Sequence, residues 1–349
     1  MNSSCLQSWP EPVVCVQSLA ESGISKIPGR YVKPPSQRPD GGTVKKMRNI
    51  PVVDMEKVES GAAVKEMAEA CREWGFFQII NHGISGEMIE CVKESWKEFF
   101  NQPLDLKNQY ANTPATYEGY GSRLGIEKGA ILDWSDYFFL NFLPLSLRNP
   151  TKWPAFPSSF KKVIEEYGDE VVKVCAKLMK GLSMGLGLEE EYLLNAFGGE
   201  KGIGGSMRAN MYPKCPQPDL TLGLSSHSDP GGITILLADH NVPGLQVLKG
   251  NDWITVDPIP NALIVNIGDQ IQVLSNGIYK SVKHRVMVNP NKERVSLAFF
   301  YNPKGDLIIE PSKELLTKER PSLFPPMTFD EYRLYIRKKG ICGTSKHQQ

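Results

Sequence analysis

Five side chains in the second half of the chain constrain its fold more than any other feature. They are two histidines, an aspartate, an arginine and a serine: His227 and Asp229 are two residues apart, His284 follows at a distance, and Arg294 and Ser296 are again two apart. Residues two apart on an extended strand point to the same side, so each pair can converge on one site. A fold that joins them must bring separate strand-like segments together.

Two imidazoles and one carboxylate are a known set of metal ligands. They occupy one face of an ion and leave positions open on the other, as in the non-haem Fe(II) oxygenases. His227, Asp229 and His284 are therefore the candidate metal ligands, with His227 and Asp229 expected on a single strand. His284 lies in a β-branched run that follows Asn276-Gly277, a typical hairpin-turn sequence. The pattern favours an enzyme that catalyses oxidation over one that catalyses hydrolysis.

Arg294 and Ser296 on one strand face would form a charged and geometrically selective site for a carboxylate. Ordinary alternatives are buried, hydrogen-bonded histidines in place of metal ligands and a surface charge at Arg294. The remaining histidines, His82, His240 and His347, are expected to be structural or solvated. The ordered conjunction of ligand pair, distant histidine and Arg-x-Ser, all in strand-like segments, favours the metal site.

The composition excludes several classes of protein. The chain has 349 residues, 41% of them hydrophobic, enough for one large domain or two modest ones. A net charge of +1 with interspersed signs argues against nucleic acid as a partner. Seven cysteines without paired spacing fit reduced thiols. We expect a cytoplasmic monomer with neither a secretory signal nor a membrane span.

The periodicity of the chain predicts an α+β fold. Helical spacing covers Ala62–Trp74, Met88–Phe100 and Phe160–Leu186, and a buried strand covers 76–81. Short strands from about residue 202 to Tyr301 predict an antiparallel jelly roll, the double-stranded β-helix, flanked by helices. The expected divisions are an arm and linker (1–49), an N-terminal α/β region (50–155), helical support with the jelly-roll core (156–303) and a C-terminal extension (304–349).

The C-terminal extension contains one clear helix signal. Thr328 and Glu331 form a capping-box pattern before a helix predicted over Phe329–Lys339. Because this helix follows the barrel directly, we expect it to lie over the barrel mouth as a lid.

Several motifs resemble those of the plant 2-oxoglutarate- and Fe(II)-dependent dioxygenase superfamily. The likeness runs from about Ile50 to Tyr301 and includes the segments 75–83, 210–216, 227–229, 244–247, 266–269 and 284–285. Within that superfamily, the segments 9–12, 117–123, 133–137 and 225–232 are most similar to the jasmonate-induced oxygenases. The resemblance implies a hydroxylase that needs Fe(II), 2-oxoglutarate as cosubstrate and O2, with ascorbate helpful in assays.

The implied substrate is a small carboxylate with an apolar body. Resemblance to the jasmonate-induced oxygenases implies conversion of jasmonic acid to 12-hydroxyjasmonic acid, a step that removes the hormone. A flavonoid-type dioxygenase, similar to anthocyanidin or flavonol synthase, is the alternative enzyme. A non-catalytic small-acid binder is a further alternative, although it would have no need to keep both the metal ligands and the Arg-x-Ser pair.

The resemblance also implies the residues around the cosubstrate. It places Arg294 and Ser296 on the far carboxylate of 2-oxoglutarate, with Tyr212 and Asn210 nearby. If Tyr212 and Asn210 face inward, alternation along the strand turns Arg208 inward too, and Met207, Ala209 and Met211 outward. A buried arginine needs a partner, either a protein carboxylate or a ligand. The resemblance favours a substrate carboxylate.

Further substrate residues follow from alternation and helical spacing. Phe300 shares the face of Arg294 on its strand. Phe329, Arg333 and Arg337 recur every four residues on the C-terminal helix and share a face that can cover the substrate. The alternative for the two arginines is the general preference of cations for helix C-termini. Phe139 is a candidate pocket aromatic, or else a core strand residue.

Overall fold

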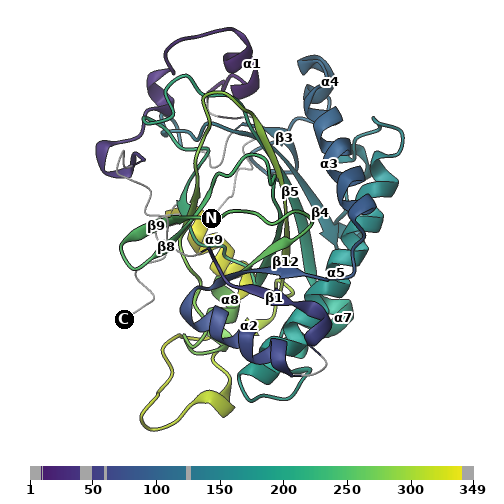
Figure 1. Ribbon diagram of the computed structural model, residues 1–349, viewed down its shortest axis with the longest axis vertical. Helices are drawn as coiled ribbons and strands as arrows, with labels where there is room; N and C mark the ends of the chain where they lie inside the picture. The colour runs from purple at the N-terminus through teal and green to yellow at the C-terminus, as the bar shows by residue number, and fades with distance from the viewer. Residues whose placement is uncertain (1–8, 10, 40–48, 59–60, 123–126, 340–349) are drawn as a thin grey trace, which may run out of the picture.

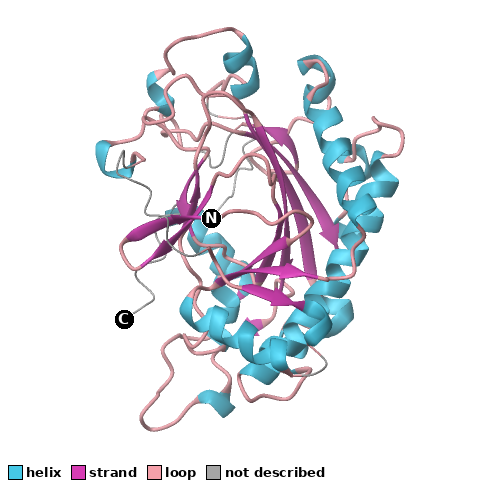
Figure 2. Ribbon diagram, viewed as in Figure 1, coloured by secondary structure: helices cyan, strands magenta, loops and turns pink. Residues whose placement is uncertain are grey.

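The computed structural model describes residues 9, 11–39, 49–58, 61–122 and 127–339, except for the side chains of residues 200, 201 and 337–339 (Figure 1). The described strands form a large eight-stranded sheet, a four-stranded sheet and a two-stranded sheet. Figure 2 shows the large sheet between long helices on one side and the smaller sheet on the other. This is the jelly-roll core with flanking helices expected from the sequence.

Neighbouring strands of the large sheet are antiparallel, apart from the parallel pair β1–β2. Its order is β1 (Val52–Asp54), β2 (Phe76–Ile80), β10 (Leu263–Ile267), β7 (Ile233–Leu237), β12 (Arg294–Asn302), β5 (Gly204–Tyr212), β4 (Asp136–Leu143) and β3 (Gly119–Gly121). The smaller sheet has the order β6 (Leu224–His227), β11 (His284–Val286), β8 (Leu245–Lys249) and β9 (Asp252–Thr255). The third sheet pairs β13 (Ile308–Ile309) with β14 (Met327–Thr328).

Three amphipathic helices cover the outer face of the large sheet. These are α2 (Ala62–Glu73), α3 (Gly86–Phe100) and α5 (Phe160–Gly185), close to the predicted ranges. The shorter helices are α1 (Val16–Glu21), α4 (Leu104–Asn108), α6 (Tyr192–Ala196), α7 (Gly199–Gly202), α8 (Asp269–Leu274) and α9 (Phe329–Lys339). Short 3-10 helices occupy Gly29–Tyr31, Pro35–Gln37, Met55–Lys57, Leu145–Leu147, Pro150–Lys152 and Lys313–Leu315.

The alternation of side chains along β5 separates the hydrophobic core from the barrel interior. Met207, Ala209 and Met211 are buried in the core that the helices share, as predicted. Arg208, Asn210 and Tyr212 therefore point to the opposite face, which is the inner one. The outer face supplies the hydrophobic packing, and the inner face is left for polar chemistry.

The N-terminal arm packs on the body of the protein. Asp136 on β4 accepts hydrogen bonds from the backbone N–H groups of Val16 and Gln17 at 2.9 and 2.8 Å, which satisfies the first donors of α1. The Lys33 ammonium, 2% exposed, forms a 2.7 Å ion pair with Asp133. The arm is thereby attached by buried charged groups as well as by hydrophobic contacts.

Two local predictions were wrong. Asn276 and Gly277 have positive φ angles of 49° and 77°, but they follow the C-terminal end of α8 and do not join two strands. Left-handed residues also follow helix C-termini, so an Asn-Gly pair alone does not distinguish the two structures. Asp229 is not on a strand with His227, because β6 ends at His227 and Asp229 lies in the following loop.

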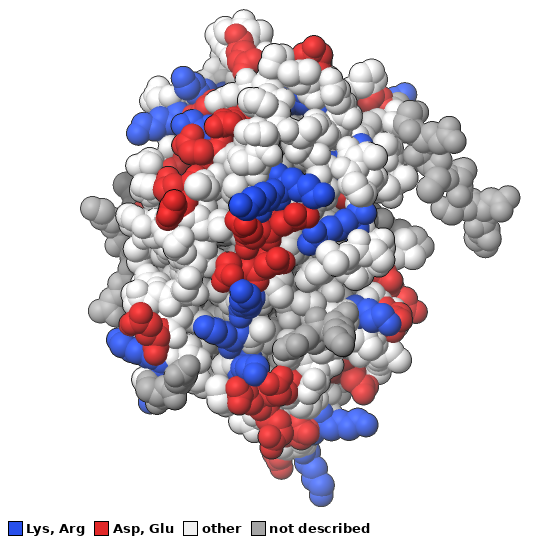
Figure 3. Space-filling model, turned by 90° about the vertical axis from the view of Figure 1, so that its right-hand side faces the viewer, with Lys and Arg blue, Asp and Glu red and all other residues white. Residues whose placement is uncertain are grey.

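The capping box of α9 is present as predicted. The Thr328 backbone N–H donates to Glu331 Oε2 at 2.9 Å, and the Glu331 N–H donates to Thr328 Oγ1 at 3.3 Å. Across the described part of the chain, no helix has the length and apolar character to cross a membrane. The face in Figure 3 carries basic and acidic side chains intermixed.

Candidate active site

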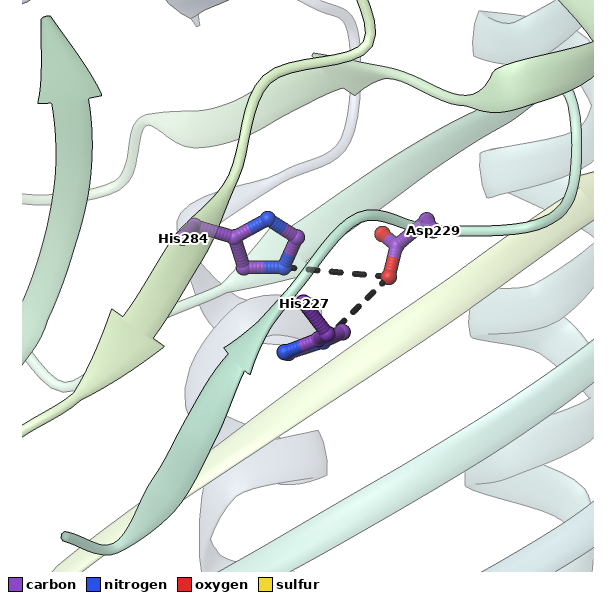
Figure 4. Close-up of side chains that lie close together, drawn as sticks. All are labelled: His227, Asp229 and His284. Atoms are coloured by element: carbon purple, nitrogen blue, oxygen red, sulfur yellow. Dashed lines mark ion pairs between the residues drawn. The ribbon is translucent and has the colours of Figure 1, made fainter. Parts of the chain in front are cut away.

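Three donor side chains meet inside the barrel. His227 at the end of β6 and His284 at the start of β11 are direct cross-strand partners. His227 Nε2 lies 3.5 Å, and His284 Nε2 3.7 Å, from Asp229 Oδ1 (Figure 4). The donor atoms of the three residues all lie within 4.8 Å of one another. The fold thus brings together the three residues predicted to bind metal.

Backbone carbonyls orient the two imidazole rings. His227 Nδ1 is 2.8 Å from the Ser225 carbonyl oxygen, and His284 Nδ1 is 3.2 Å from that of Val282. A carbonyl oxygen only accepts hydrogen bonds, so each Nδ1 carries the proton. Each Nε2 then has a free lone pair on the side of the cluster, as a metal ligand requires.

Two residues that the sequence reasoning missed orient the Asp229 carboxylate. Thr234 Oγ1 and Asn266 Nδ2 donate hydrogen bonds to Asp229 Oδ2 at 2.6 and 2.9 Å. This leaves Oδ1 facing the imidazoles. Thr234 and Asn266 are cross-strand partners on β7 and β10, so alternation along β7 was a signal that could have located Thr234.

The charges of the site favour the metal-binding protonation states of His284 and Asp229. At His227 burial lowers the pKa, but the hydrogen bond and charge of Asp229 outweigh burial and raise that pKa. Burial, with the neighbouring His227, lowers the pKa of His284 to about 4. Burial raises the pKa of Asp229, but the neighbouring His284 and His227 outweigh it and hold that pKa well below its usual range. A neutral His284 and an ionised Asp229 at neutral pH are the forms that coordinate metals.

Arg294 forms a second, cationic part of the interior. It is 3% exposed, its guanidinium carbon lies 5.1 Å from the centroid of the Tyr212 ring, and its Nη1 donates to Ser296 Oγ at 3.4 Å. Tyr212 and Asn210 lie directly opposite Arg294 and Ser296 in the β5–β12 register. Arg294 Nε has no hydrogen-bond partner among the described residues, although the charge of Asp239 acts on the guanidinium. A buried cation with an unsatisfied donor suits an anionic ligand.

Arg208 is a second cation on the inner face. Its Nε and Nη2 atoms are buried and have no hydrogen-bond partner within the described structure. Its guanidinium lies over the ring of Tyr137, another residue that sequence reasoning missed, although alternation from Phe139 could have found it. Phe139 faces Arg208 across β4–β5, and Phe300 lies on the same side of β12. The structure therefore places Arg208 beside two of the three predicted aromatic residues.

Helix α9 positions only part of the predicted set. Phe329 is 4% exposed, whereas Arg333 is half exposed and pairs with Asp330 at 3.7 Å. The backbone of Arg337 belongs to α9, but its side chain lies outside the described part. The convergence of Arg208, Arg333 and Arg337 stays a prediction.

Among the described residues, the cluster contains no other histidine. His82 is 7% exposed; its Nε2 lies 2.8 Å from the Asn261 carbonyl oxygen, and its Nδ1 accepts from the Ile84 N–H. His82 is structural, as expected. His347 lies outside the described residues.

Comparisons with known proteins agree with this geometry. Residues 203–303 match the 2OG-Fe(II) oxygenase superfamily, and residues 50–156 match the N-terminal region described as non-haem dioxygenase in morphine synthesis. Jasmonate-induced oxygenase 1 of Arabidopsis thaliana is 58% identical over 346 residues, covering 97% of this chain and 86% of that protein. The chain belongs to the 2OG-Fe(II) oxygenase superfamily. This oxygenase is therefore a dioxygenase enzyme that uses Fe(II) and 2-oxoglutarate.

Two further relatives differ in the substrates that their names indicate. The crystal structure of JOX2 in complex with 2OG, Fe and JA superposes on the oxygenase with a TM-score of 0.89, at 57% identity and 95% coverage of both chains. Flavanone 3-dioxygenase 2 of Oryza sativa subsp. japonica is 41% identical, covering 90% of this chain and 92% of that protein. The names of these two relatives indicate different substrates, so the family alone does not identify the substrate of this oxygenase.

The residues present fit both cofactors. Two neutral imidazole nitrogens and one carboxylate oxygen suit Fe(II) with open positions for further ligands. The unpaired Arg294 Nε and the nearby Ser296 hydroxyl suit the dicarboxylate. We therefore find no conflict between the side chains of this oxygenase and the cofactors of its superfamily.

Proposed function

We propose that this oxygenase hydroxylates jasmonic acid to 12-hydroxyjasmonic acid. The observation that carries the proposal is Arg208, a cation on the inner face whose Nε and Nη2 are buried without partners. A carboxylate on the substrate would satisfy it. The identity to jasmonate-induced oxygenases and the likeness to JOX2 in complex with JA support the same substrate.

We propose the following holders for the cofactors. Fe(II) is held by His227 Nε2, His284 Nε2 and Asp229 Oδ1, the three atoms that face one another. The far carboxylate of 2-oxoglutarate pairs with Arg294 and Ser296, beside Tyr212 and Asn210. The partners of Asp229 Oδ2 keep the carboxylate from rotating, so Oδ1 stays directed at the cluster.

When bound, Fe(II) and 2-oxoglutarate supply with O2 the oxidant that inserts one oxygen atom into a C–H bond, while the second leaves in succinate together with CO2. Side chains do not perform this chemistry, so the chain contributes positioning and exclusion of water. Arg208, with Arg333 and Arg337 at the mouth, would orient the substrate carboxylate. Phe139, Phe300 and Phe329 would enclose its apolar body.

A flavonoid is the competing substrate, and a silent acid binder is the competing non-enzyme. A neutral phenolic would leave the buried Nε and Nη2 atoms of the partly buried Arg208 without an acceptor, which costs free energy. An assembled ligand cluster beside an unpaired Arg294 has no use in a binder that carries out no oxidation. The jasmonate proposal therefore provides an acceptor for the unpartnered atoms of Arg208, as 2-oxoglutarate does for Arg294.

The test measures O2-dependent succinate and hydroxylated product from purified protein with free jasmonic acid, its methyl ester and a flavanone. Jasmonic acid should be turned over and the ester poorly, because the ester lacks the charge. An Arg333→Ala, Arg337→Ala double variant should lose the preference for the free acid. Equal turnover of acid and ester by the wild type, or normal turnover of the acid by the double variant, contradicts the arginine-anchor model. A preference for the flavanone would establish the flavonoid alternative.

We further infer a cytosolic monomer that does not bind nucleic acid and keeps the four-part division given above. The five cysteines of the described chain are unpaired, which supports a reducing compartment. Sedimentation of the purified protein tests whether it is a monomer. Fractionation of cells tests whether it is cytosolic.

A further inference from the structure

One buried carboxyl group has no part in the chemistry proposed so far. Asp269, the first residue of α8, is 6% exposed. Its backbone N–H donates to the Asp229 carbonyl oxygen at 2.8 Å, and its Oδ2 accepts from the Ser228 hydroxyl at 3.4 Å. Asp269 is therefore attached to the loop that carries the Asp229 ligand, through both backbone and side chain.

The same Asp269 oxygen accepts a shorter hydrogen bond from the C-terminal helix. The Tyr332 hydroxyl donates to Oδ2 at 2.6 Å. Tyr332 lies one turn beyond Phe329, the buried residue at the start of α9, whereas the neighbouring Arg333 and Leu334 are exposed. Figure 1 shows α9 beside α8, in agreement with this contact. One carboxyl group thus connects α9 with the metal-binding loop.

The start of α9 is also attached through its backbone. The Phe329 N–H donates to the Leu307 carbonyl oxygen at 3.3 Å, and the Asp330 N–H donates to that of Gly305 at 2.9 Å. These two bonds lie in the first turn, next to the β13–β14 pairing that precedes the helix. The Tyr332 contact lies one turn later and adds a side-chain attachment beyond the first turn.

We propose that Tyr332 and Asp269 form a latch that positions α9 over the substrate and couples that position to the metal-binding loop. The inference deepens the proposed function and rests on it where Arg333 and Arg337 are assigned to the substrate. Phe329 and Arg333 lie four residues apart on one face, so holding the rotation of α9 holds both. Tyr332 and Asp269 are positioning residues, because they act through α9 and the loop.

Thermodynamic reciprocity gives the latch a measurable consequence. If closure of α9 stabilises the arrangement of Ser228 and Asp229, substrate should tighten metal binding, and metal should tighten substrate binding by the same factor. Without the latch, the metal site and the substrate site should bind their ligands independently. Metal affinity measured without substrate should then be close to that of the wild type.

The central variant is Tyr332→Phe, which removes one hydroxyl and keeps the ring. We expect amide hydrogen exchange in residues 329–336 to rise roughly tenfold, as loss of one hydrogen bond to a charged group implies. KM for jasmonic acid should rise by a similar factor, KM for 2-oxoglutarate should stay unchanged, and succinate per hydroxylated product should increase. The gain in metal affinity on adding substrate, measured by calorimetry with Mn(II), should be lost.

The matched control is Tyr110→Phe, which also removes a hydrogen-bonded hydroxyl, since Tyr110 accepts from the Ala155 N–H at 3.0 Å and packs near Phe99 and Phe138. This control should resemble the wild type in all five measurements. The double variant Asp269→Asn, Tyr332→Phe should increase hydrogen exchange no more than the single variant with the larger effect. Wild-type exchange in Tyr332→Phe, or additive effects in the double variant, overturns the latch.

Failure of the latch and failure of the proposed function give different results. If the wild type turns over jasmonic acid but Tyr332→Phe matches it in exchange and KM, the latch is wrong and the function stands. If the wild type does not turn over jasmonic acid, the substrate proposal fails. Hydrogen exchange in Tyr332→Phe without substrate then still decides whether the hydrogen bond holds α9.

Discussion

The guanidinium carbon of Arg208 lies 4.4 Å from the centroid of the Tyr137 ring. The ring is itself held by Asn112, whose Nδ2 donates to the Tyr137 hydroxyl at 2.7 Å. A cation–π contact of this kind contributes about 0.5–2 kcal/mol, which is less than the cost of burying an unpaired charge. Arg208 is therefore oriented by Tyr137 but is not neutralised by it.

Replacing Arg208 with methionine tests its role as the substrate cation. Arg208→Met keeps length and apolar volume while removing the charge. Losing one partner of a buried charge pair costs about 2–5 kcal/mol, so KM for jasmonic acid should rise roughly thirty-fold or more. KM for 2-oxoglutarate should not change. Tyr137→Phe, which keeps the ring, is the control and should have a small effect; an unchanged KM in Arg208→Met would remove Arg208 from the substrate site.

Arg294→Ala should weaken 2-oxoglutarate and leave jasmonic acid largely unaffected. The reason is that Arg294 pairs with Tyr212, whereas Arg208 pairs with Ala298, two inner-face positions farther along the strands. The same buried-charge argument predicts a loss of roughly thirty-fold or more in 2-oxoglutarate affinity. Calorimetric titration of 2-oxoglutarate in the presence of Mn(II) measures it. An unchanged affinity would show that another cation holds the cosubstrate.

His227→Ala, Asp229→Ala and His284→Ala should each abolish turnover while leaving the fold intact. Each removes one of the three donor atoms that meet in the barrel. Product formation at saturating Fe(II) and circular dichroism of each variant are the measurements. Wild-type product formation by any of the three would refute the metal assignment.

The inner face was predictable because strands repeat every two residues. Once Arg294 and Ser296 were assigned to one face, alternation placed Phe300 with them, and the register with β5 bears this out. The long helices could also be predicted from the sequence. For example, α5 begins at Phe160, the residue predicted from the apolar spacing. In both cases local periodicity carries the information.

The remaining features depend on contacts between distant segments. The Asn-Gly sequence at residues 276–277 suits a hairpin and a helix end equally, and only tertiary packing decides between them. The Tyr332–Asp269 bond joins residues 63 positions apart, and no local pattern indicates it. The Asn266 partner of Asp229 was missed for a similar reason, since it lies 37 residues away in the sequence.

Buried His82 predicts a pH dependence of folding stability. Burial lowers its pKa below the usual 6.5, and the hydrogen bond to the Asn261 carbonyl offsets only part of this effect. As pH falls below 6.5, the unfolded chain binds a proton that the folded one does not, so this contribution to stability is complete above pH 6.5 and declines below it. Urea unfolding at pH 7.5 and 5.5 should show a smaller decline for His82→Gln than for the wild type. An equal decline in both proteins would assign the effect to other groups.

Thr234→Val tests whether the groups behind Asp229 tune the metal site. The substitution keeps the shape of the side chain and removes the hydroxyl that donates to Asp229 Oδ2 at 2.6 Å. Partners of metal ligands typically contribute 10–100-fold to affinity, so Fe(II) affinity should fall by about that factor, with KM for jasmonic acid unchanged at saturating metal. Thr255→Val is the matched control, because Thr255 accepts a hydrogen bond from Gln246 in the smaller sheet and does not contact the ligands. Equal Fe(II) affinity in the two variants would mean that Asn266 alone holds the carboxylate in place.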